Sequence, residues 1–388
     1  MFLTDTVKNT MPELVAIRHY LHENPELGLS EFNTSDYIAK QLESMGYTLT
    51  RGLATTGMVA TLKVGTGSKS IGIRADIDAL PILEETGLHY ASKNPGKMHA
   101  CGHDGHTTML LGAAKMIAER RNFSGTVNLI FQPAEENFGG AKIMVEEGIF
   151  EKCPCDAVFG LHNEPGLPFG QFAFREGPIM AAVDECQITI HGQGGHGAEP
   201  QDTRDPIIAG ASIVMALQTI ISRNIHPMEP TVITVGSFHA GSASNIIPER
   251  AELVIGIRSF DEDVRNQLEQ RITQIAHAQA ESFGMTATVN YQRSYDATIN
   301  HVKETAYLRS LAVKFAGAEN VVDLERPFMG SEDFAYFLKE KPGTYFFLGG
   351  QKSPDDKPLH HPAFDFNDDL LPIGAAFWTE LVEDYLPA

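Results

Sequence analysis

Cysteine is scarce in this sequence of 388 residues, and the four that it has do not form the framework of a disulfide-stabilised domain. Basic residues are also few, with 30 Lys and Arg against 50 Asp and Glu, which gives a net charge of −20 at pH 7. A field of this sign repels phosphate backbones and anionic membranes. We therefore expect neither nucleic acid nor a membrane as a partner.

Long apolar runs are missing as well. The first ten residues contain Asp5 and Lys8 and lack the apolar core of a signal peptide. No run approaches the roughly 18 consecutive apolar residues that a membrane helix needs. Together with the small number of cysteines, these absences predict a soluble, cytoplasmic protein with reduced thiols.

What is present is the composition of a folded globular protein, with 43% hydrophobic and 21% charged residues. The length is roughly two to three times that of a usual domain, so we expect two domains. Short apolar runs with Gly, Pro or polar boundaries predict strands at 57–64, 70–77, 126–132 and 156–163. Helical periodicity between them, at 106–121 and 139–148, predicts an α/β fold with a mostly parallel central sheet and helices on both faces.

The pattern changes near Asp184. From there the sequence has strand character at 184–192, 231–240, 250–260 and 285–294, and helical character at 205–223 and 261–284. The order βαββαβ is that of a ferredoxin-like α+β domain. We therefore predict such a domain over residues 184–295, inserted into an α/β domain formed by residues 1–183 and 296–388.

Ionisable side chains gather just beyond the ends of three predicted strands. Asp76 and Asp78 lie at the end of the strand at 70–77, Glu135 and Glu136 follow the strand at 126–132, and His162 lies at the end of the strand at 156–163. Open parallel sheets build their sites at the carboxyl ends of strands, so we expect these groups to meet. Two short segments, MHACGHDGH and PLHHP, add further donors: His99, Cys101, His103, Asp104, His106, His360 and His361.

Imidazole, thiolate and carboxylate groups together are ligands for zinc, with manganese or cobalt as alternatives. Cys101 alone would more often be a small buried hydrophobic residue, but it lies two residues from His103 in a Gly-rich loop. If one of Glu135 and Glu136 binds metal, the other can act as general base and then as acid to a leaving amine. The alternative is two solvated loop glutamates, and spacing alone does not assign their roles.

Eight motifs then resemble, in the right order, those of the di-metal aminoacylase family, in its branch of hippurate hydrolases, N-acyl-amino-acid amidohydrolases and auxin-conjugate hydrolases. They are IRADIDALP at 73–81, MHACGHDGHT at 98–107, FQPAEE at 131–136, GLHNEP at 160–165, GQGGHGAEP at 192–200, SNIIPE at 244–249, GSEDF at 330–334 and LHHPAFDFND at 359–368. The resemblance covers nearly the whole chain. It implies a zinc-exopeptidase-like catalytic domain whose inserted domain is a lid and a dimerisation module.

On the matching positions, the resemblance implies a site for two divalent ions per subunit, manganese or zinc, with cobalt or nickel as substitutes. Cys101 would bridge both ions, and Glu135 would be the general base. The remaining ligands would be His103, Glu136, His162 and His360. The family usually has another small polar residue at position 361, so His361 is a departure and an alternative ligand.

The resemblance also implies roles around the metals. Asp76 falls at the position of a carboxylate that orients a ligand or the water at the metals. Asp104 and His106 are weaker candidates for such a role, and Asp104 could instead cap the helix that follows it.

In the inserted domain, His196 resembles the residue that reaches into the partner subunit's site and stabilises the oxyanion. Asn245 and Arg258 match positions that hold the substrate, and a guanidinium suits the free carboxylate of an acyl-amino acid. For Arg258, an ordinary ion pair on the strand surface is the alternative.

The resemblance implies an enzyme that hydrolyses the amide bond of N-acyl amino acids, such as hippurate-like, N-acetyl or indole-acetyl conjugates, to a carboxylic acid and a free amino acid. The inserted domain implies a homodimer, and a homotetramer is the next possibility. A dipeptidase or exopeptidase with the same metals is one alternative. A metal-binding scaffold without catalysis is another, although the retention of Glu135, which ligation does not need, argues against it.

Overall fold

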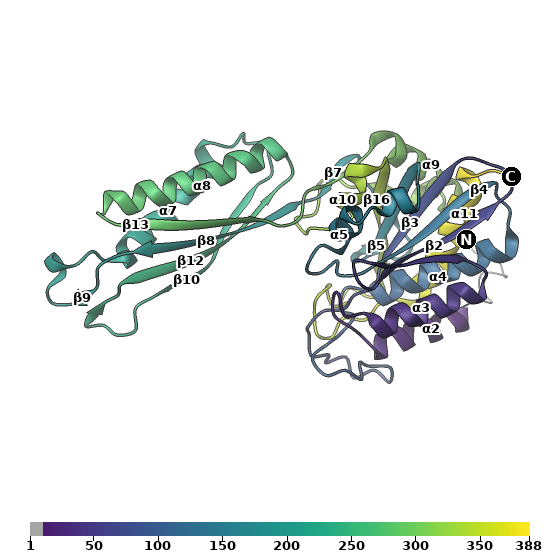
Figure 1. Cartoon of the computed structure of the whole chain (residues 1–388), viewed down its shortest axis with the longest axis horizontal. Helices are drawn as coiled ribbons and strands as arrows, with labels where there is room; N and C mark the ends of the chain where they lie inside the picture. The colour runs from purple at the N-terminus through teal and green to yellow at the C-terminus, as the bar shows by residue number, and fades with distance from the viewer. Residues whose placement is uncertain (1–10) are drawn as a thin grey trace. The chain divides into compact units, whose positions relative to one another are not determined.

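The computed structural model describes residues 11–388 as two compact units (Figure 1). The first unit contains Met1–Ile179, Ile299–Pro327 and Asp333–Ala388, and the second contains Met180–Thr298 and Phe328–Glu332. The divisions lie a few residues from the predicted ones, and the short segment 328–332 groups with the second unit instead of the first. The expectation that no signal peptide is present concerns residues 1–10, which lie outside the described range.

The first unit is built on one eight-stranded sheet, whose central strands are parallel. In order across the sheet, the strands are β1 (Thr48–Leu53), β2 (Gly57–Val64), β4 (Gly125–Gln132), β3 (Ser70–Asp76), β5 (Ala157–Pro168), β16 (Gly343–Gln351), β6 (Phe172–Phe174) and β15 (Val321–Asp323). Strands β4, β3, β5 and β16 run parallel to one another. The pairs β1–β2, β2–β4 and β6–β16 are antiparallel, and β15 pairs parallel with β6. The predicted mostly parallel sheet is confirmed.

Helices cover both faces of this sheet, as predicted (Figure 1). On one face lie α4 (His103–Arg120), α9 (Val302–Ala316) and α11 (Leu371–Tyr385), and α2 (Met11–Glu23) and α3 (Phe32–Ser44) pack against α4. On the other face lie α5 (Gly140–Glu146), α6 (Ile149–Lys152) and α10 (Ala335–Glu340). Short 3-10 turns occur at Pro200–Asp202, Ala318–Asn320 and Asp368–Leu370.

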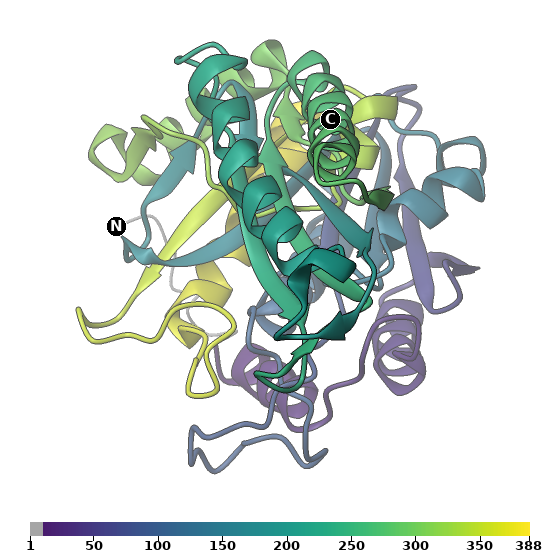
Figure 2. The ribbon, with the colours of Figure 1, turned by 90° about the vertical axis from the view of Figure 1, so that its left-hand side faces the viewer.

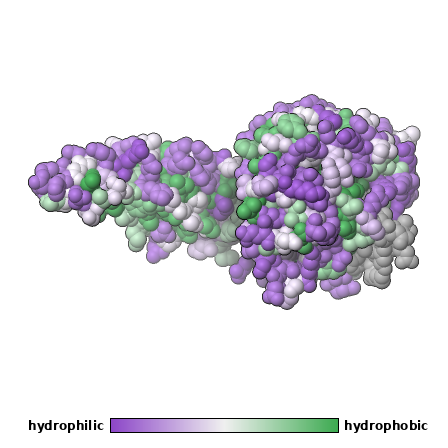
Figure 3. Space-filling view, turned by 90° about the horizontal axis from the view of Figure 1, so that it is seen from below, coloured by the Kyte–Doolittle hydropathy of each residue, from purple (hydrophilic) through white to green (hydrophobic). Residues whose placement is uncertain are grey.

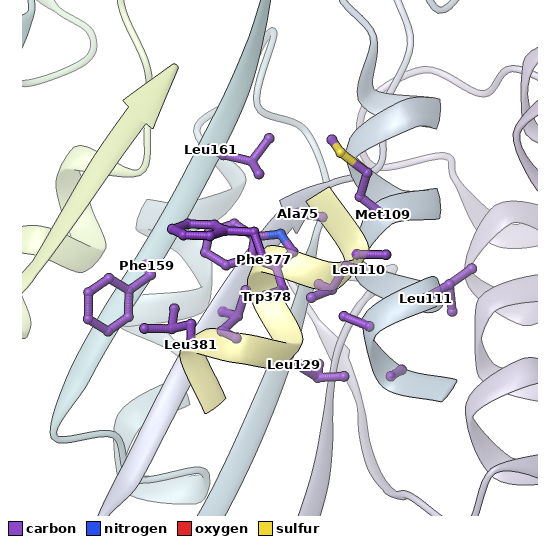
Figure 4. Close-up of a cluster of buried hydrophobic side chains, with 14 of the residues drawn as sticks. Ala75, Met109, Leu110, Leu111, Leu129, Phe159, Leu161, Phe377, Trp378 and Leu381 are labelled. Carbon is purple, nitrogen blue, oxygen red and sulfur yellow. The ribbon is translucent and has the colours of Figure 1, made fainter. Parts of the chain in front are cut away.

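The main core lies between α4, α11 and the sheet (Figure 4). Trp378 and Phe377 of α11 meet apolar side chains of β3, β4 and β5, such as Leu129 and Phe159, all of them almost fully buried. Strands covered on both faces are expected to be apolar throughout. In β3 that rule is broken by Arg74 and Asp76, which are buried just as completely, at the end of the strand where the donors gather.

The sequence prediction misplaced some element boundaries. Helix α4 begins at His103, not at residue 106, because Gly102 adopts a left-handed N-cap conformation (φ 89°) and starts the helix without a polar cap. Strand β1 was not predicted, since its sequence TLTRGL is half exposed and has no apolar run. The four cysteines are free and buried, as expected.

The second unit is a four-stranded antiparallel sheet with two helices on one face. The strand order is β10 (Val232–Ala240), β12 (Arg250–Ser259), β8 (Ala182–His191) and β13 (Thr286–Arg293), which is the arrangement of the predicted ferredoxin-like fold. Helices α7 (Pro206–Arg223) and α8 (Glu262–Ser282) lie side by side on this sheet (Figures 1 and 2). Two-stranded pairs complete the fold: β9 (Gly195–His196) with β11 (Ile246–Ile247), and β7 (Gly177–Met180) with β14 (Thr298–Asn300).

Helix α7 is the one helix within residues 11–388 that is long and apolar enough to cross a membrane. A core helix of a globular domain passes the same test, and α7 buries Ile213 and Leu217 in the core of the second unit. Its outer face exposes apolar side chains, chiefly Ile208 and Met215. Elsewhere, hydrophilic residues cover most of the face shown in Figure 3, with hydrophobic residues in smaller groups. That no membrane partner exists stays a prediction.

Candidate metal centre

The parallel strands deliver their donors to one edge of the sheet. Asp76 is the last residue of β3, Glu135 follows β4, and His162 lies within the outer part of β5. His103 opens α4 directly after the loop that contains Cys101. Because the strands are parallel, their carboxyl ends share an edge, and the loop after β16 adds His360 there.

Two donor groups share Cys101. Cys101, His103 and His162 form one group, and Cys101, Glu136 and His360 form the other; within each, the candidate ligand atoms lie within 4.8 Å of one another. The Cys101 Sγ lies 3.3 Å from His162 Nε2, and Glu136 Oε1 lies 3.4 Å from His360 Nε2. The structure therefore brings all five predicted ligands together, with the thiol common to both groups.

Glu135 belongs to a third group, with His103 and Glu136. Its side chain is 6% exposed, and it therefore lies inside the cluster and not in solvent. The alternative of two solvated loop glutamates does not describe this arrangement.

The two buried histidines present the same nitrogen to the cluster. His103 Nδ1 lies 3.0 Å from the carbonyl oxygen of Asp78, and His162 Nδ1 lies 2.7 Å from that of Asn163. A carbonyl only accepts hydrogen bonds, so Nδ1 carries the proton in both rings and donates it. Each ring therefore turns Nε2 toward the cluster, as in histidines that bind metal: His103 Nε2 lies 3.8 Å from Glu136 Oε1, and His162 Nε2 lies 3.3 Å from Cys101 Sγ.

These residues fit a metal ion. His103 Nε2 and Glu136 Oε1 are buried and have no hydrogen-bond partner within residues 11–388. Buried polar atoms nearly always have a partner, and the two atoms face the same space. A cation placed among them would satisfy both, and the combination of thiolate, imidazole and carboxylate suits a borderline divalent metal.

The electrostatics of the cluster lead to the same conclusion. Burial lowers the pKa of His103, but the carboxylates of Asp76, Asp78 and Glu136 outweigh it and raise that pKa to about 10. Burial, and then the negative charges nearby, also raise the pKa of the Cys101 thiol well above its usual range. Without a cation the cluster therefore holds protons in these positions, and a divalent ion would replace them.

Asp76 and His106 form a buried pair beside the ligands. His106 Nδ1 donates to Asp76 Oδ1 at 2.7 Å, and Asp76 lies 3.6 Å from His103 Nε2. Arg74 donates to Asp76 Oδ2 at 2.7 Å. Burial opposes ionisation, but Arg74, His103 and His106 hold the pKa of Asp76 well below its usual range.

Asp78 has a role that the sequence did not reveal. Its carboxylate accepts the backbone N–H of Glu136 at 3.0 Å and lies 3.3 Å from His103 Nδ1, so one aspartate supports two ligands. The only feature of the sequence that indicated this role is the position of Asp78, two residues after Asp76 at the end of the same strand.

The N-cap residue of α4 is Gly102, but Asp104 takes part in capping as the alternative held, because its Oδ1 accepts the Gly105 N–H of the first turn at 2.9 Å. Asp104 Oδ2 accepts hydrogen bonds from Arg18 Nε at 2.9 Å and from His22 Nδ1 at 2.8 Å. Arg18 and His22 lie on the buried stripe of α2 with Leu14, Ile17 and Leu21. Polar residues on an apolar stripe are the signal that could have identified them.

His360, not His361, faces the cluster. The ring of His360 is 52% exposed, its backbone is left-handed (φ 64°), and its N–H donates to the Ala100 carbonyl at 2.8 Å. His361 Nδ1 instead accepts the N–H of Ala363 at 2.9 Å, and within the described part of the chain no donor group includes it.

In the second unit, His196 and Asn245 lie together and Arg258 does not. His196 pairs with Ile246 across β9 and β11, and the Gly197 N–H donates to the Asn245 carbonyl. His196 and Asn245 are exposed. They adjoin the start of β12, whereas Arg258 lies near its end, about 26 Å further along an extended strand.

The guanidinium of Arg258 is half-buried, and burial lowers its pKa. It donates to the carbonyl of Ile257, and it forms no ion pair with any residue from 11 to 388. The surface ion pair considered as an alternative is therefore not found in that range.

A second buried carboxylate, Glu31, holds the loop that leads to Glu135. Its Oε1 accepts the Ala134 N–H at 2.9 Å, and its Oε2 accepts the Thr56 hydroxyl at 2.7 Å. Ala134 is left-handed (φ 55°), so the loop needs such an anchor. Burial raises the pKa of Glu31 to about 7, although both hydrogen bonds favour the ionised form.

Comparison with known proteins gives consistent matches along the chain. The model of peptidase family M20/M25/M40 matches residues 72–384. The hippurate hydrolase of Campylobacter jejuni is 41% identical over 100% of both chains. The IAA-amino acid hydrolase ILR1-like 4 of Arabidopsis thaliana is also 41% identical, over 99% of this chain and 88% of its own.

A solved structure with the same fold is that of the Bacillus subtilis YXEP protein, a dinuclear metal binding peptidase from the M20 family. It is 32% identical, covers 98% of this chain and 99% of its own, and has a TM-score of 0.84.

The raised pKa of Glu31 predicts how stability depends on pH. Between pH 4.5, where an ordinary glutamate ionises, and about 7, the folded protein keeps a proton that the unfolded chain loses. The free energy of unfolding should therefore fall as the pH rises through this window, by up to about 3 kcal/mol. Urea denaturation at pH 5 and pH 8 should show that the free energy of unfolding falls less between these pH values in Glu31→Gln than in the unmodified chain. An equal fall in both proteins would contradict the assignment.

Proposed function

This chain belongs to peptidase family M20/M25/M40 and is an amidohydrolase, and we propose that it splits N-acyl amino acids into a carboxylic acid and a free amino acid. The observation that carries the proposal is that Cys101 is common to two donor groups while Glu135 lies beside them. The names of its relatives, which include a hippurate hydrolase and an IAA-amino acid hydrolase, support the same class of substrate.

We propose two divalent ions, of manganese or zinc, with cobalt or nickel as substitutes. Cys101 would be the shared ligand, and the other ligands would be His103, His162, Glu136 and His360. Bound ions of this kind polarise the amide carbonyl and lower the pKa of water at the site. A thiolate ligand favours zinc by its softness, and the carboxylate is equally suited to manganese.

Glu135 would move the protons. Its carboxylate is buried next to the ligands and takes a proton from the attacking water. It then returns that proton to the departing amine, because the amine must be protonated to leave as a free amino acid. Asp78 and Asp76 keep His103 in place during this exchange, the former through the His103 Nδ1–H and the latter beside its Nε2.

The second unit would bind the substrate and complete the site in a homodimer, or in a homotetramer made of such dimers. Arg258, which has a half-buried guanidinium, would bind the free carboxylate of the substrate. His196 and Asn245 lie near the start of β12, and Arg258 lies near its other end, so we propose that His196 and Asn245 serve the partner subunit's site, where His196 stabilises the oxyanion. The exposed apolar side chains of α7 suit a contact between subunits. We also propose a cytoplasmic location.

A panel of substrates tests the function. The purified chain, supplied with manganese or zinc, should release amino acids from N-acetyl, N-benzoyl and indole-acetyl derivatives. It should act much more slowly on unblocked dipeptides and on acyl-amino-acid amides, which lack the carboxylate that Arg258 would bind. Activity confined to dipeptides would show a peptidase instead, and activity on the amides equal to that on the acids would remove the role of Arg258.

The two adjacent glutamates should have different effects. Glu135→Gln should retain both metal ions and lose turnover by a factor of about 10² to 10⁴, because it loses only the proton acceptor. Glu136→Gln should lose metal as well, since it removes a ligand. Metal content measured beside kcat separates the two, and near-normal turnover in Glu135→Gln would rule out the assigned base.

Mixing inactive variants tests whether His196 acts in the partner's site. Glu135→Gln and His196→Ala should each be inactive alone. After denaturation and refolding together, about a quarter of normal activity should return, because half of the random dimers contain one intact site of two. If His196 served its own chain, no activity would return. The same mixture without refolding is the control.

A further inference from the structure

We propose that Arg18 is a positioning residue of the metal centre, which fastens the segment carrying His103 to the segment carrying His360. The inference rests on the proposed metal-dependent function, but it concerns the binding of the ions and can be tested without substrate. Arg18 lies on α2, far from the ligands in sequence, and belongs to none of the motifs described above.

The guanidinium of Arg18 is fully buried and contacts three carboxylates. Its Nε donates to Asp104 at 2.9 Å, its Nη2 to Asp365 at 3.0 Å, and its Nη1 to Asp368 at 3.1 Å. Asp104 is the residue after His103, and Asp365 and Asp368 follow His360 within the same segment. One side chain therefore joins the segments on either side of the metal centre.

His22, one turn further along α2, makes a second connection. Asp104 is ionised, so the 2.8 Å contact places a proton on His22 Nδ1, which donates to Asp104. His22 Nε2 lies 3.3 Å from Glu84. The next residue, Glu85, donates its N–H to the carbonyl of Pro362 at 2.8 Å, two residues from His360.

The His360 segment needs such support. Its left-handed backbone is disfavoured for a residue with a Cβ, and the half-exposed ring has few neighbours to hold it. The position of His360 therefore depends on its backbone, which donates to the Ala100 carbonyl, and on the segment after it, which Arg18 holds through the Asp365 side chain. Asp365 is held by Arg18, Tyr90 and Lys352.

Stability alone does not explain the buried charge. Taking a guanidinium out of water is costly, and an apolar side chain with good packing often serves stability as well as a buried ion pair does. Three carboxylates around one guanidinium also fix the relative positions of the segments that carry them. Since those segments carry ligands, the geometry points to metal affinity as the property that Arg18 controls.

The test is the dissociation constant for zinc and for manganese, measured on the full chain by competition with a chelating dye. Arg18→Lys keeps a positive charge beside Asp104 but cannot reach all three carboxylates, and it should weaken binding of the less tightly held ion about 10-fold. Arg18→Met should weaken it more. At saturating metal, Arg18→Lys should regain a kcat close to that of the unmodified chain, which a damaged active site would not.

Arg265→Met is the matched control. Arg265 is also buried and pairs with three carboxylates, Asp184 at 3.0 Å, Glu262 at 3.7 Å and Asp296, but it lies in the second unit, away from the candidate ligands in sequence. It should lower the melting temperature and leave the metal affinity unchanged. The inference fails if Arg18→Lys binds both ions as tightly as the unmodified chain, or if Arg265→Met weakens binding as much.

If Arg18→Met does not fold, Asp365→Asn replaces it, because it removes one contact at the His360 end and leaves Arg18 paired with Asp104. It should weaken metal binding several-fold, and unchanged binding would count against the inference. Failure of the proposed function looks different: a chain that binds two ions, loses affinity in Arg18→Lys and hydrolyses no acyl-amino acid supports the role of Arg18 and rejects the substrate class.

Discussion

The dominant constraint in this molecule is a concentration of acidic groups inside its larger unit. Asp76, Asp78 and Glu135 are all buried at one edge of the sheet, beside the buried Cys101 thiol. Buried negative charges this close together are unfavourable unless cations or hydrogen-bond donors lie beside them. The fold supplies buried hydrogen-bond donors and cations around the cluster, and leaves its centre to an ion. The placement of the arginines, the histidines and the loops can be understood from this requirement.

Two buried arginines bind carboxylates in and around this cluster, from different elements. Arg74 binds Asp76 at 2.7 Å and Gln132 at 2.7 Å, so it ties the ends of β3 and β4 to each other. Arg18 binds Asp104 and Asp365 and so ties α4 to the segment after β16. Both hold the carboxylates that neighbour the ligands, and a metal site held this way is already arranged before the ion arrives, which reduces the cost of ordering it.

Much of this architecture was predictable, because the relevant signals are local. Apolar runs and turn residues located the central strands, and parallel strands then imply a common edge for Asp76, Glu135 and His162. The ferredoxin-like order of the second unit followed from helical and strand periods alone. The contacts that hold the site were not predictable in this way. Arg18 and Asp365 are 347 residues apart, and only packing brings them together. The left-handed Gly102 likewise moved the start of α4 to His103 against the expected capping chemistry.

The two units differ in how far their candidate functional residues are exposed to water. In the first, the groups of the candidate metal centre other than His360 are buried, so their electrostatic interactions are strong. In the second, His196 and Asn245 are exposed at one end of the sheet and Arg258 is half-buried near the other. Groups that must meet a substrate have to be reachable, and an exposed histidine stabilises an oxyanion only weakly until water is excluded around it. A second copy of the chain is the simplest agent that could exclude it. With the proposed function, the first unit would supply the buried groups for amide hydrolysis, and a second copy would exclude water around His196.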